Sequence, residues 1–160
     1  MVDRKDVGSW LEGPSSRTQG TGEWPGQRLG LAQHGPGSVA RFGRRFVGLV
    51  IDWVVALLIA HGLFQVPLPF SEHAATGTQS FIVLGIFAVM NVLLVGTIGT
   101  TIGHRIMGLQ VRSVAGGRAT PAQALVRTVL LCLAIPAVIW DRDGRGLHDK
   151  VPNTVIVRVR

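Results

Sequence analysis

The chain has 160 residues, enough for one domain, and it is 47% hydrophobic but only 16% charged. A soluble domain of this size usually carries about 25% charged residues, so the composition argues against an ordinary soluble protein. The net charge is +7, but the basic residues lie mainly outside the apolar segments and form no stripe with interleaved aromatics. We therefore expect no nucleic-acid partner.

Residues 1–40 are rich in Gly, Pro, Ser and Gln and have no apolar period, which predicts a disordered cytosolic tail. No apolar stretch follows the early charges, so the tail does not resemble a signal peptide. Within it, Trp24, Leu29 and Leu31 surround a Pro-Gly pair and form a candidate docking segment for a partner protein. An ordinary linker is the alternative. Residues 41–160 form the predicted membrane domain.

Two apolar segments predict membrane-spanning helices, at about 44–65 and about 80–99. Roughly 20 mainly apolar residues cover a hydrocarbon core of about 30 Å. Pro67 and Pro69 end the first helix, because proline cannot continue one. Asp52 costs about 2.5–3.5 kcal/mol on the insertion scale, and the surrounding aliphatic residues offset that cost.

The distribution of basic residues predicts the orientation. Seven Lys or Arg precede or begin the first helix, none lies in the 66–79 loop, and three lie in the 100–121 segment. Basic segments stay in the cytosol, so we expect a multi-pass protein with a cytosolic N-terminus. The preference for Arg, Ala and Gly fits a GC-rich bacterial genome, and we place the chain in the bilayer of the bacterial plasma (inner) membrane.

A third apolar stretch, at about 122–140, contains Arg127 and Pro136. If it crossed the membrane, it would export the five Lys or Arg of residues 141–160, against the rule above. We therefore favour a short re-entrant helical element, whose backbone is tolerated where protein covers it. A third true span is the alternative.

Residues 106–114 and 154–160 alternate in hydropathy and read as strands. In the second strand, valines alternate with the two arginines near the C-terminus. The predicted fold is therefore a membrane all-α class, with two transmembrane helices, the third helical element and a small cytosolic β-strand pair.

Arg45 and Asp52 are seven residues apart, so they share one helix face but lie about 10.5 Å apart along the axis. Each therefore needs another partner. For Asp52 we predict Arg127 first and Asn91 second, forming an intramembrane polar cluster. A pair that locks the helices together is the preferred interpretation, and a proton or cation site is the alternative.

Small residues recur near these polar groups. Gly48 and Ala56 flank Asp52 at a spacing of four, and Gly99 and Gly103 repeat that spacing after the second helix. Such spacing lets membrane helices approach closely, so we interpret these residues as helix-packing positions.

Motifs for catalysis or metal binding are missing from the sequence. The acids and histidine of 141–150 match no established ligand spacing, and His34, His61 and His104 are isolated. Cys132 is the only cysteine, which excludes an internal disulfide and a cysteine-based metal site. We expect no cofactor and no metal, and a protein that is not an enzyme.

The order of these features resembles the RDD family of bacterial membrane proteins. GRRFVGLVIDW supplies Arg45 and Asp52, GTTIGHRIMGLQV resembles the family's segment after the second helix, and GLHDKVPNTVIV supplies Asp149 as the family-motif aspartate. The similarity covers about residues 38–160. It implies membrane residence and a link to transport.

Two functions from different classes follow. The first is a non-catalytic accessory or assembly subunit of a larger inner-membrane complex, bound to membrane-protein partners or to further copies of itself. The second is an oligomeric transporter of a cation, proton or small ligand that uses the Arg45/Asp52 face. Two or three helical elements can hardly enclose a pathway alone, which favours the first.

Overall fold

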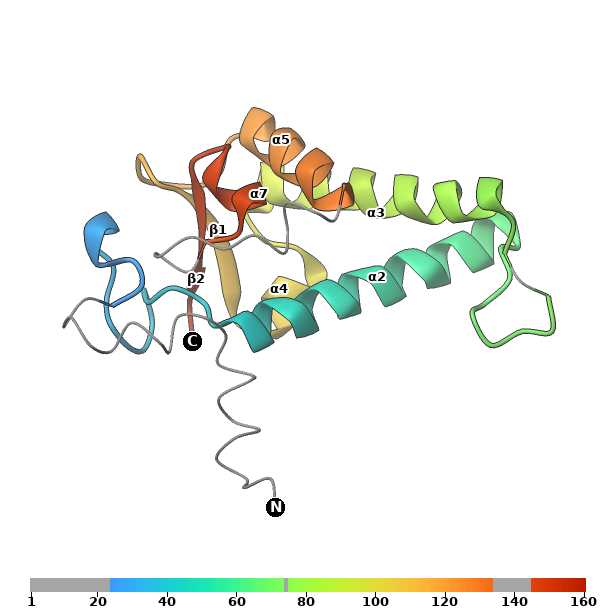
Figure 1. The fold of residues 1–160 in the computed structure, drawn as a ribbon, viewed down its shortest axis with the longest axis horizontal. Helices are drawn as coiled ribbons and strands as arrows, with labels where there is room; N and C mark the ends of the chain where they lie inside the picture. The colour runs from blue at the N-terminus through green and yellow to red at the C-terminus, as the bar shows by residue number, and fades with distance from the viewer. Residues whose placement is uncertain (1–23, 74, 134–144) are drawn as a thin grey trace, which may run out of the picture.

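A computed structural model describes residues 24–73, 75–133 and 145–160. Two long helices, α2 (Phe42–Phe64) and α3 (Gly77–Ile98), form an antiparallel hairpin. The other described elements gather at one end of it (Figure 1), and we call them, with residues 24–41, the cap. They are η2 (Gln27–Leu29), α4 (Ile102–Ile106), β1 (Leu109–Ser113), α5 (Pro121–Cys132), α7 (Leu147–Lys150) and β2 (Thr154–Arg158).

Both hairpin helices lie within three residues of their predicted bounds, and local signals explain where they begin and end. Thr76 and Gln79 form a capping box that starts α3, satisfying donors that the first turn leaves open. Gly99 ends α3 with φ 78°, a left-handed conformation that glycine adopts without strain. At the end of α2, Gln65 takes a similar conformation with φ 52°.

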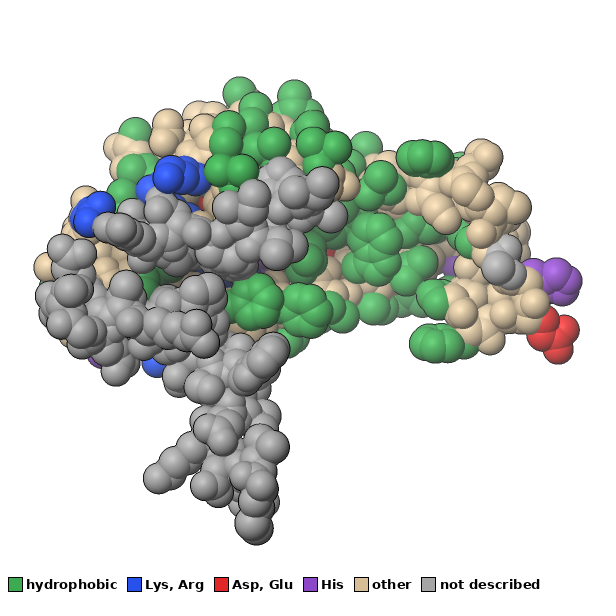
Figure 2. Space-filling view, in the orientation of Figure 1, with side chains coloured by type: hydrophobic (Ala, Val, Ile, Leu, Met, Phe, Trp, Pro, Cys, Tyr) green, Lys and Arg blue, Asp and Glu red, His purple; other side chains and the backbone are tan. Residues whose placement is uncertain are grey.

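The outer faces of the hairpin are apolar. Only 22% of the most hydrophobic window of each helix is buried, whereas the core helix of a soluble protein is mostly buried. Figure 2 shows hydrophobic side chains along the hairpin, with Lys and Arg visible at the cap end. Large exposed side chains include Val50, Leu58, Leu63, Phe81, Val89 and Leu93. By length and composition, both helices are candidate membrane spans.

The cap is built on a small antiparallel sheet. β1 pairs with β2 in the register that places Val111 opposite Ile156. On the other edge of β2, Val39 forms an antiparallel bridge with Val157. The strand pair expected from the sequence is present, and residues before α2, after α3 and at the C-terminus all meet at one end of the hairpin.

Residues 24–40, part of the predicted disordered tail, include segments that contact the cap sheet. Leu29 and Leu31 pack against the buried cluster of Val39, Val155 and Val157. The candidate docking segment therefore contacts the chain's own sheet, and it covers the valine face of β2. Residues 1–23 lie outside the described part of the chain.

Two cap elements differ from the sequence-based expectation. The first predicted strand began at 106, but residues 102–106 form α4, because the Thr101 side chain accepts a hydrogen bond from the His104 backbone and starts a helix. The third helical element, predicted over 122–140, is α5 and ends at Cys132 among the described residues. Residues 134–144 lie outside them.

Candidate functional site

Asp149 lies at the centre of a buried ion cluster between the cap and α2. Its carboxylate oxygens lie 2.6 Å from Arg127 Nε on α5 and 3.4 Å from Arg45 Nη1 on α2. His148 Nε2 lies 3.5 Å from the same carboxylate. Asp149 is fully buried, while Arg45 and Arg127 are 6% and 2% exposed. One carboxylate thus fastens α5 and α7 to the first turns of α2.

The cations decide the ionisation of this carboxylate. Burial disfavours the charged form, but the charges of Arg127, His148 and Arg45 outweigh it and hold the pKa of Asp149 below its usual value. Asp149 is therefore an anion at neutral pH. Breaking such a buried pair by removing one partner typically costs about 3–5 kcal/mol in soluble proteins, because the other charge is left uncompensated.

Asp52 is held by α4. Its Oδ2 accepts a hydrogen bond from the Thr101 hydroxyl at 2.5 Å, and its Oδ1 accepts one from the Gly103 backbone N–H at 2.8 Å. The backbones of α2 and α4 can approach this closely because Gly103 has no Cβ. A Cβ at that position would overlap the Gly48 carbonyl. Glycine at position 103 is thus a condition for the Asp52 contacts.

His104 extends this network toward the cap. Its Nδ1 lies 2.8 Å from Thr101 Oγ1, whose only proton goes to Asp52, so Nδ1 is the protonated nitrogen of a neutral ring. Burial, reinforced by the charge of Arg127, lowers the pKa of His104 to about 3. The ring is therefore neutral at physiological pH.

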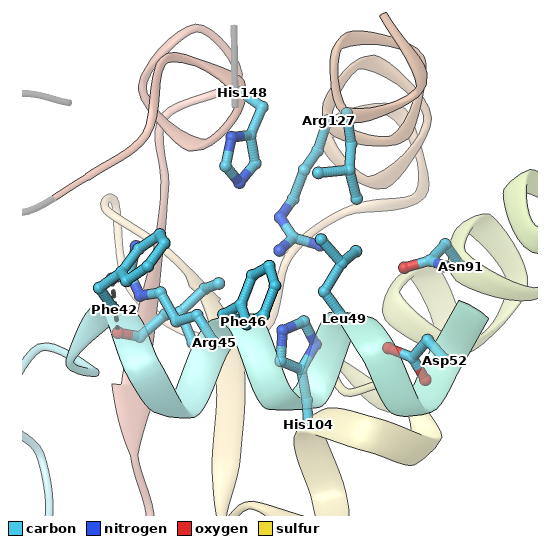
Figure 3. Close-up of a pocket in the computed structure, with 11 residues that line it drawn as sticks. Phe42, Arg45, Phe46, Leu49, Asp52, Asn91, His104, Arg127 and His148 are labelled. Atoms are coloured by element: carbon cyan, nitrogen blue, oxygen red, sulfur yellow. Dashed lines mark hydrogen bonds between the residues drawn. The ribbon is translucent and has the colours of Figure 1, made fainter. Parts of the chain in front are cut away.

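A cavity of about 70 Å³ joins the two networks. Figure 3 shows Arg127 and His148 reaching toward α2 from one side, with His104 on the opposite side and Asp52 and Asn91 beyond it. Six lining residues are polar and five are apolar. They are Arg45, Asp52, Asn91, His104, Arg127 and His148, with Phe42, Phe46, Leu49, Leu131 and Ile156.

The structure brings the four predicted polar residues together but gives them other hydrogen-bond partners than expected. Arg45, Asp52, Asn91 and Arg127 line one cavity, and Asp52 does bond to another element. The prediction that Asp52 pairs with Arg127 or Asn91 was wrong. Arg127 bonds to Asp149, and Asn91 donates to the carbonyl of Phe87 on its own helix.

The residues of the small-residue stripe have different structural roles. Gly48 and Ala56 are buried on α2, and Gly48 meets Gly103 of α4. Gly99 instead terminates α3, and its carbonyl accepts a hydrogen bond from Val111 N at 2.8 Å. Gly99 is therefore a turn residue rather than a helix-packing position.

Sequence reasoning missed Thr101, His104 and His148. A helix start at Thr101 could have been read from a threonine that precedes a short apolar segment, since threonine favours the N-cap. His104 and His148 carry no spacing signal, because their neighbours come from distant parts of the chain. Within the described residues, no group of three or more His, Cys, Asp or Glu side chains could hold a metal ion.

Comparisons with curated proteins and with solved structures found no match. A comparison with protein families matched residues 39–153 to the RDD family. That range holds all three residues of the motif, Arg45, Asp52 and Asp149, and the charge pair that joins the first to the last. Because the match covers most of the sequence, the chain belongs to the RDD family.

Proposed function

We propose that this protein is a non-catalytic integral membrane protein of the bacterial inner membrane that serves as an accessory or assembly subunit of a larger membrane complex. Its hairpin provides two spans, and its cap stays on the cytosolic side. The ion cluster around Asp149 is a structural lock between the two.

The hairpin dimensions support membrane residence. Helices of 23 and 22 residues extend about 33–35 Å at 1.5 Å per residue, close to the roughly 30 Å hydrocarbon core. Their outward side chains are large and apolar, as with Leu58 at 58% and Leu93 at 59% exposure. In water such a surface would be an aggregation liability, whereas in lipid or against partner helices it is satisfied.

The sheet supports the topology. Because β1 follows α3 and pairs with β2, the chain between them returns to the same side of the bilayer. Residue 39, which precedes α2, also joins β2. An even number of crossings is therefore required between 114 and 153, which favours a re-entrant α5 over a single third span. The positive residues of the cap support a cytosolic position for that side.

One observation carries the choice of function. The buried contacts in the half of the hairpin away from the cap are apolar, formed by Ala56, Ala60, Val66, Val83 and Phe87. Among the described residues, the polar cavity therefore has no polar continuation toward the other end between α2 and α3. A transporter needs groups that replace the hydration of its cargo along the whole path. A single chain of this kind is better suited to packing than to conduction.

The test combines reconstitution with cross-linking in cells. Purified protein in liposomes should move no protons or cations across the bilayer. A photo-reactive residue at Leu58 or Leu93 should cross-link to a defined membrane protein, and the same residue at buried Val83 should not. Flux by the purified protein that Asp52→Asn abolishes would contradict the proposal.

The cavity keeps an oligomeric transporter as a second candidate. Asp52 and Asn91 both border it, and both lie within the hairpin helices. In that case the path would run between copies of the chain, and the flux measured above would depend on protein density in the liposomes.

A further inference from the structure

The cavity is lined by buried polar residues on one side and by partly exposed apolar residues on the other. All six of its polar lining residues are buried. Phe42, Leu49 and Leu131 are partly exposed, and Phe46 is 53% exposed. In Figure 3 the Phe46 and Leu49 side chains stand beside the guanidinium of Arg127. The cavity is therefore bounded by the apolar outer surface of the hairpin on one side and by the ion cluster on the other.

The carboxylates of Asp52, in the cavity lining, and of Asp149, beside it, already have hydrogen-bond donors. Asp52 accepts hydrogen bonds through both oxygens, from Thr101 and Gly103. Asp149 is bonded by Arg127 and Arg45. Neither acid therefore needs a cation from outside.

One hydrogen-bond donor of the Arg127 guanidinium lacks an acceptor in the described part of the chain. Nη1 of Arg127 is buried and has no hydrogen-bond partner among the described residues, and Arg127 itself is 2% exposed. A buried donor without an acceptor is costly, so this guanidinium favours a ligand that brings acceptor oxygens.

The charges of the cluster favour an anion. Arg45 interacts electrostatically with Arg127 and Arg145. Arg45 and Arg127 act on the carboxylate of Asp149, and Arg127 also acts on that of Asp52. Two arginines, Arg45 and Arg127, share the single carboxylate of Asp149. A negatively charged ligand would bring the acceptor and the charge that this arrangement favours.

The cavity is larger than a single water molecule requires. A single water molecule needs about 10–15 Å³ measured in the same way, and the cavity provides about 70 Å³. A phosphate group fits within such a volume.

We propose that this cavity binds the phosphate group of an anionic phospholipid from the cytosolic leaflet. Arg127 donates to a phosphate oxygen, and the acyl chains lie along the apolar surface beside Phe46 and Leu131. Basic pockets between membrane helices on the cytosolic side are suited to anionic headgroups, and Arg45 sits in the first turn of α2, where headgroups are in reach. This inference rests on the membrane residence proposed above.

The experiment uses full-length protein extracted from the membrane fraction into detergent. It is titrated with phosphatidylglycerol and with phosphatidylcholine of the same acyl chains, and bound lipid is counted by native mass spectrometry. We expect phosphatidylglycerol to bind at least about tenfold more tightly, a difference of about 1.4 kcal/mol. Excess inorganic phosphate should not displace it, because the phosphate ion lacks the acyl chains.

Two variants test the site by charge and by volume. Arg127→Gln removes the guanidinium, while Leu131→Trp fills the cavity and leaves every charge in place. Both should lose the preference for phosphatidylglycerol. Leu58→Trp, on the exposed face of α2 and outside the cavity lining, is the matched control and should keep it. Melting curves confirm that each variant is folded.

Several outcomes would overturn the inference. Equal binding of the two lipids would mean an ordinary lipid shell, and retained preference in Leu131→Trp would place the lipid elsewhere. Displacement by inorganic phosphate would mean that the site takes the free anion. Failure to recover the protein from the membrane fraction would instead refute the proposed function, so the two failures are distinguishable.

Discussion

Replacing Asp52 tests the link between α2 and α4. The carboxylate accepts hydrogen bonds from the Thr101 hydroxyl and the Gly103 backbone N–H, and both donors are buried with it. Asp52→Leu removes both acceptors. Asp52→Asn keeps one oxygen for Gly103 and turns an amide N–H toward Thr101 Oγ1, which can accept it.

The expected loss of stability follows from the buried donors that lose their acceptor. A buried donor without a partner costs about 1–3 kcal/mol in soluble proteins, and polar pairs in membranes are worth about 0.6–2 kcal/mol. The Thr101 hydroxyl can turn to His104 Nδ1, 2.8 Å away, once the ring carries its proton on Nε2 instead, while the Gly103 N–H cannot move. We expect Asp52→Leu to cost about 2 kcal/mol and Asp52→Asn less than about 1 kcal/mol.

Thermal unfolding of the detergent-solubilised protein measures both. For a chain of this size, 1 kcal/mol shifts the melting temperature by about 2–4 °C, so Asp52→Leu should lower it by about 4–8 °C. Thr101→Val should cost about 1 kcal/mol. Thr97→Val makes the same change at an exposed threonine that bonds only to its own helix, and it should be nearly neutral.

A double-mutant cycle gives the sharpest refutation. If Asp52 and Thr101 interact as the geometry indicates, Asp52→Leu and Thr101→Val should be non-additive by about 0.5–1 kcal/mol. Additive effects, or an Asp52→Leu variant as stable as the wild type, would show that this contact does not hold α4 to α2. Equal losses for Asp52→Asn and Asp52→Leu would indicate that the charge itself matters.

Three further predictions concern topology, pH and packing. Cysteines placed at Gly116 and Glu72, in a background without the natural cysteine, should be labelled from outside the cell only at Glu72, and the reverse pattern would overturn the orientation. Burial lowers the pKa of His104 to about 3, so below pH 6.5 the unfolded chain takes up a proton that the folded chain excludes. Stability should therefore fall toward pH 5 with a slope approaching about 1.4 kcal/mol per pH unit, and His104→Gln should flatten the profile. Gly103→Ala places a methyl group against a carbonyl of α2 and should cost about 1–3 kcal/mol, whereas Gly62→Ala points into open space and should be neutral or stabilising, as unfolding midpoints in detergent would show.

Local signals in the sequence were enough for the hairpin and for β2. The length of the apolar segments and the proline or glycine residues after them define α2 and α3. Insertion into a bilayer depends on apolar length and not on which residues the helix later contacts. Alternation identified β2, the shared helix face identified Arg45 and Asp52, and the family resemblance added Asp149. These features depend on residues near one another in the chain.

The partners of the polar groups depended on the tertiary structure. Residues 45, 127 and 149 meet because α5 and α7 fold back on the start of α2, and Thr101 captures Asp52 because Gly48 and Gly103 let two backbones touch. A helix face predicts that Asp52 needs a donor, but several donors satisfy that need equally well. The packing of distant segments determines which donor lies within reach of Asp52, because it sets the distance between their backbones.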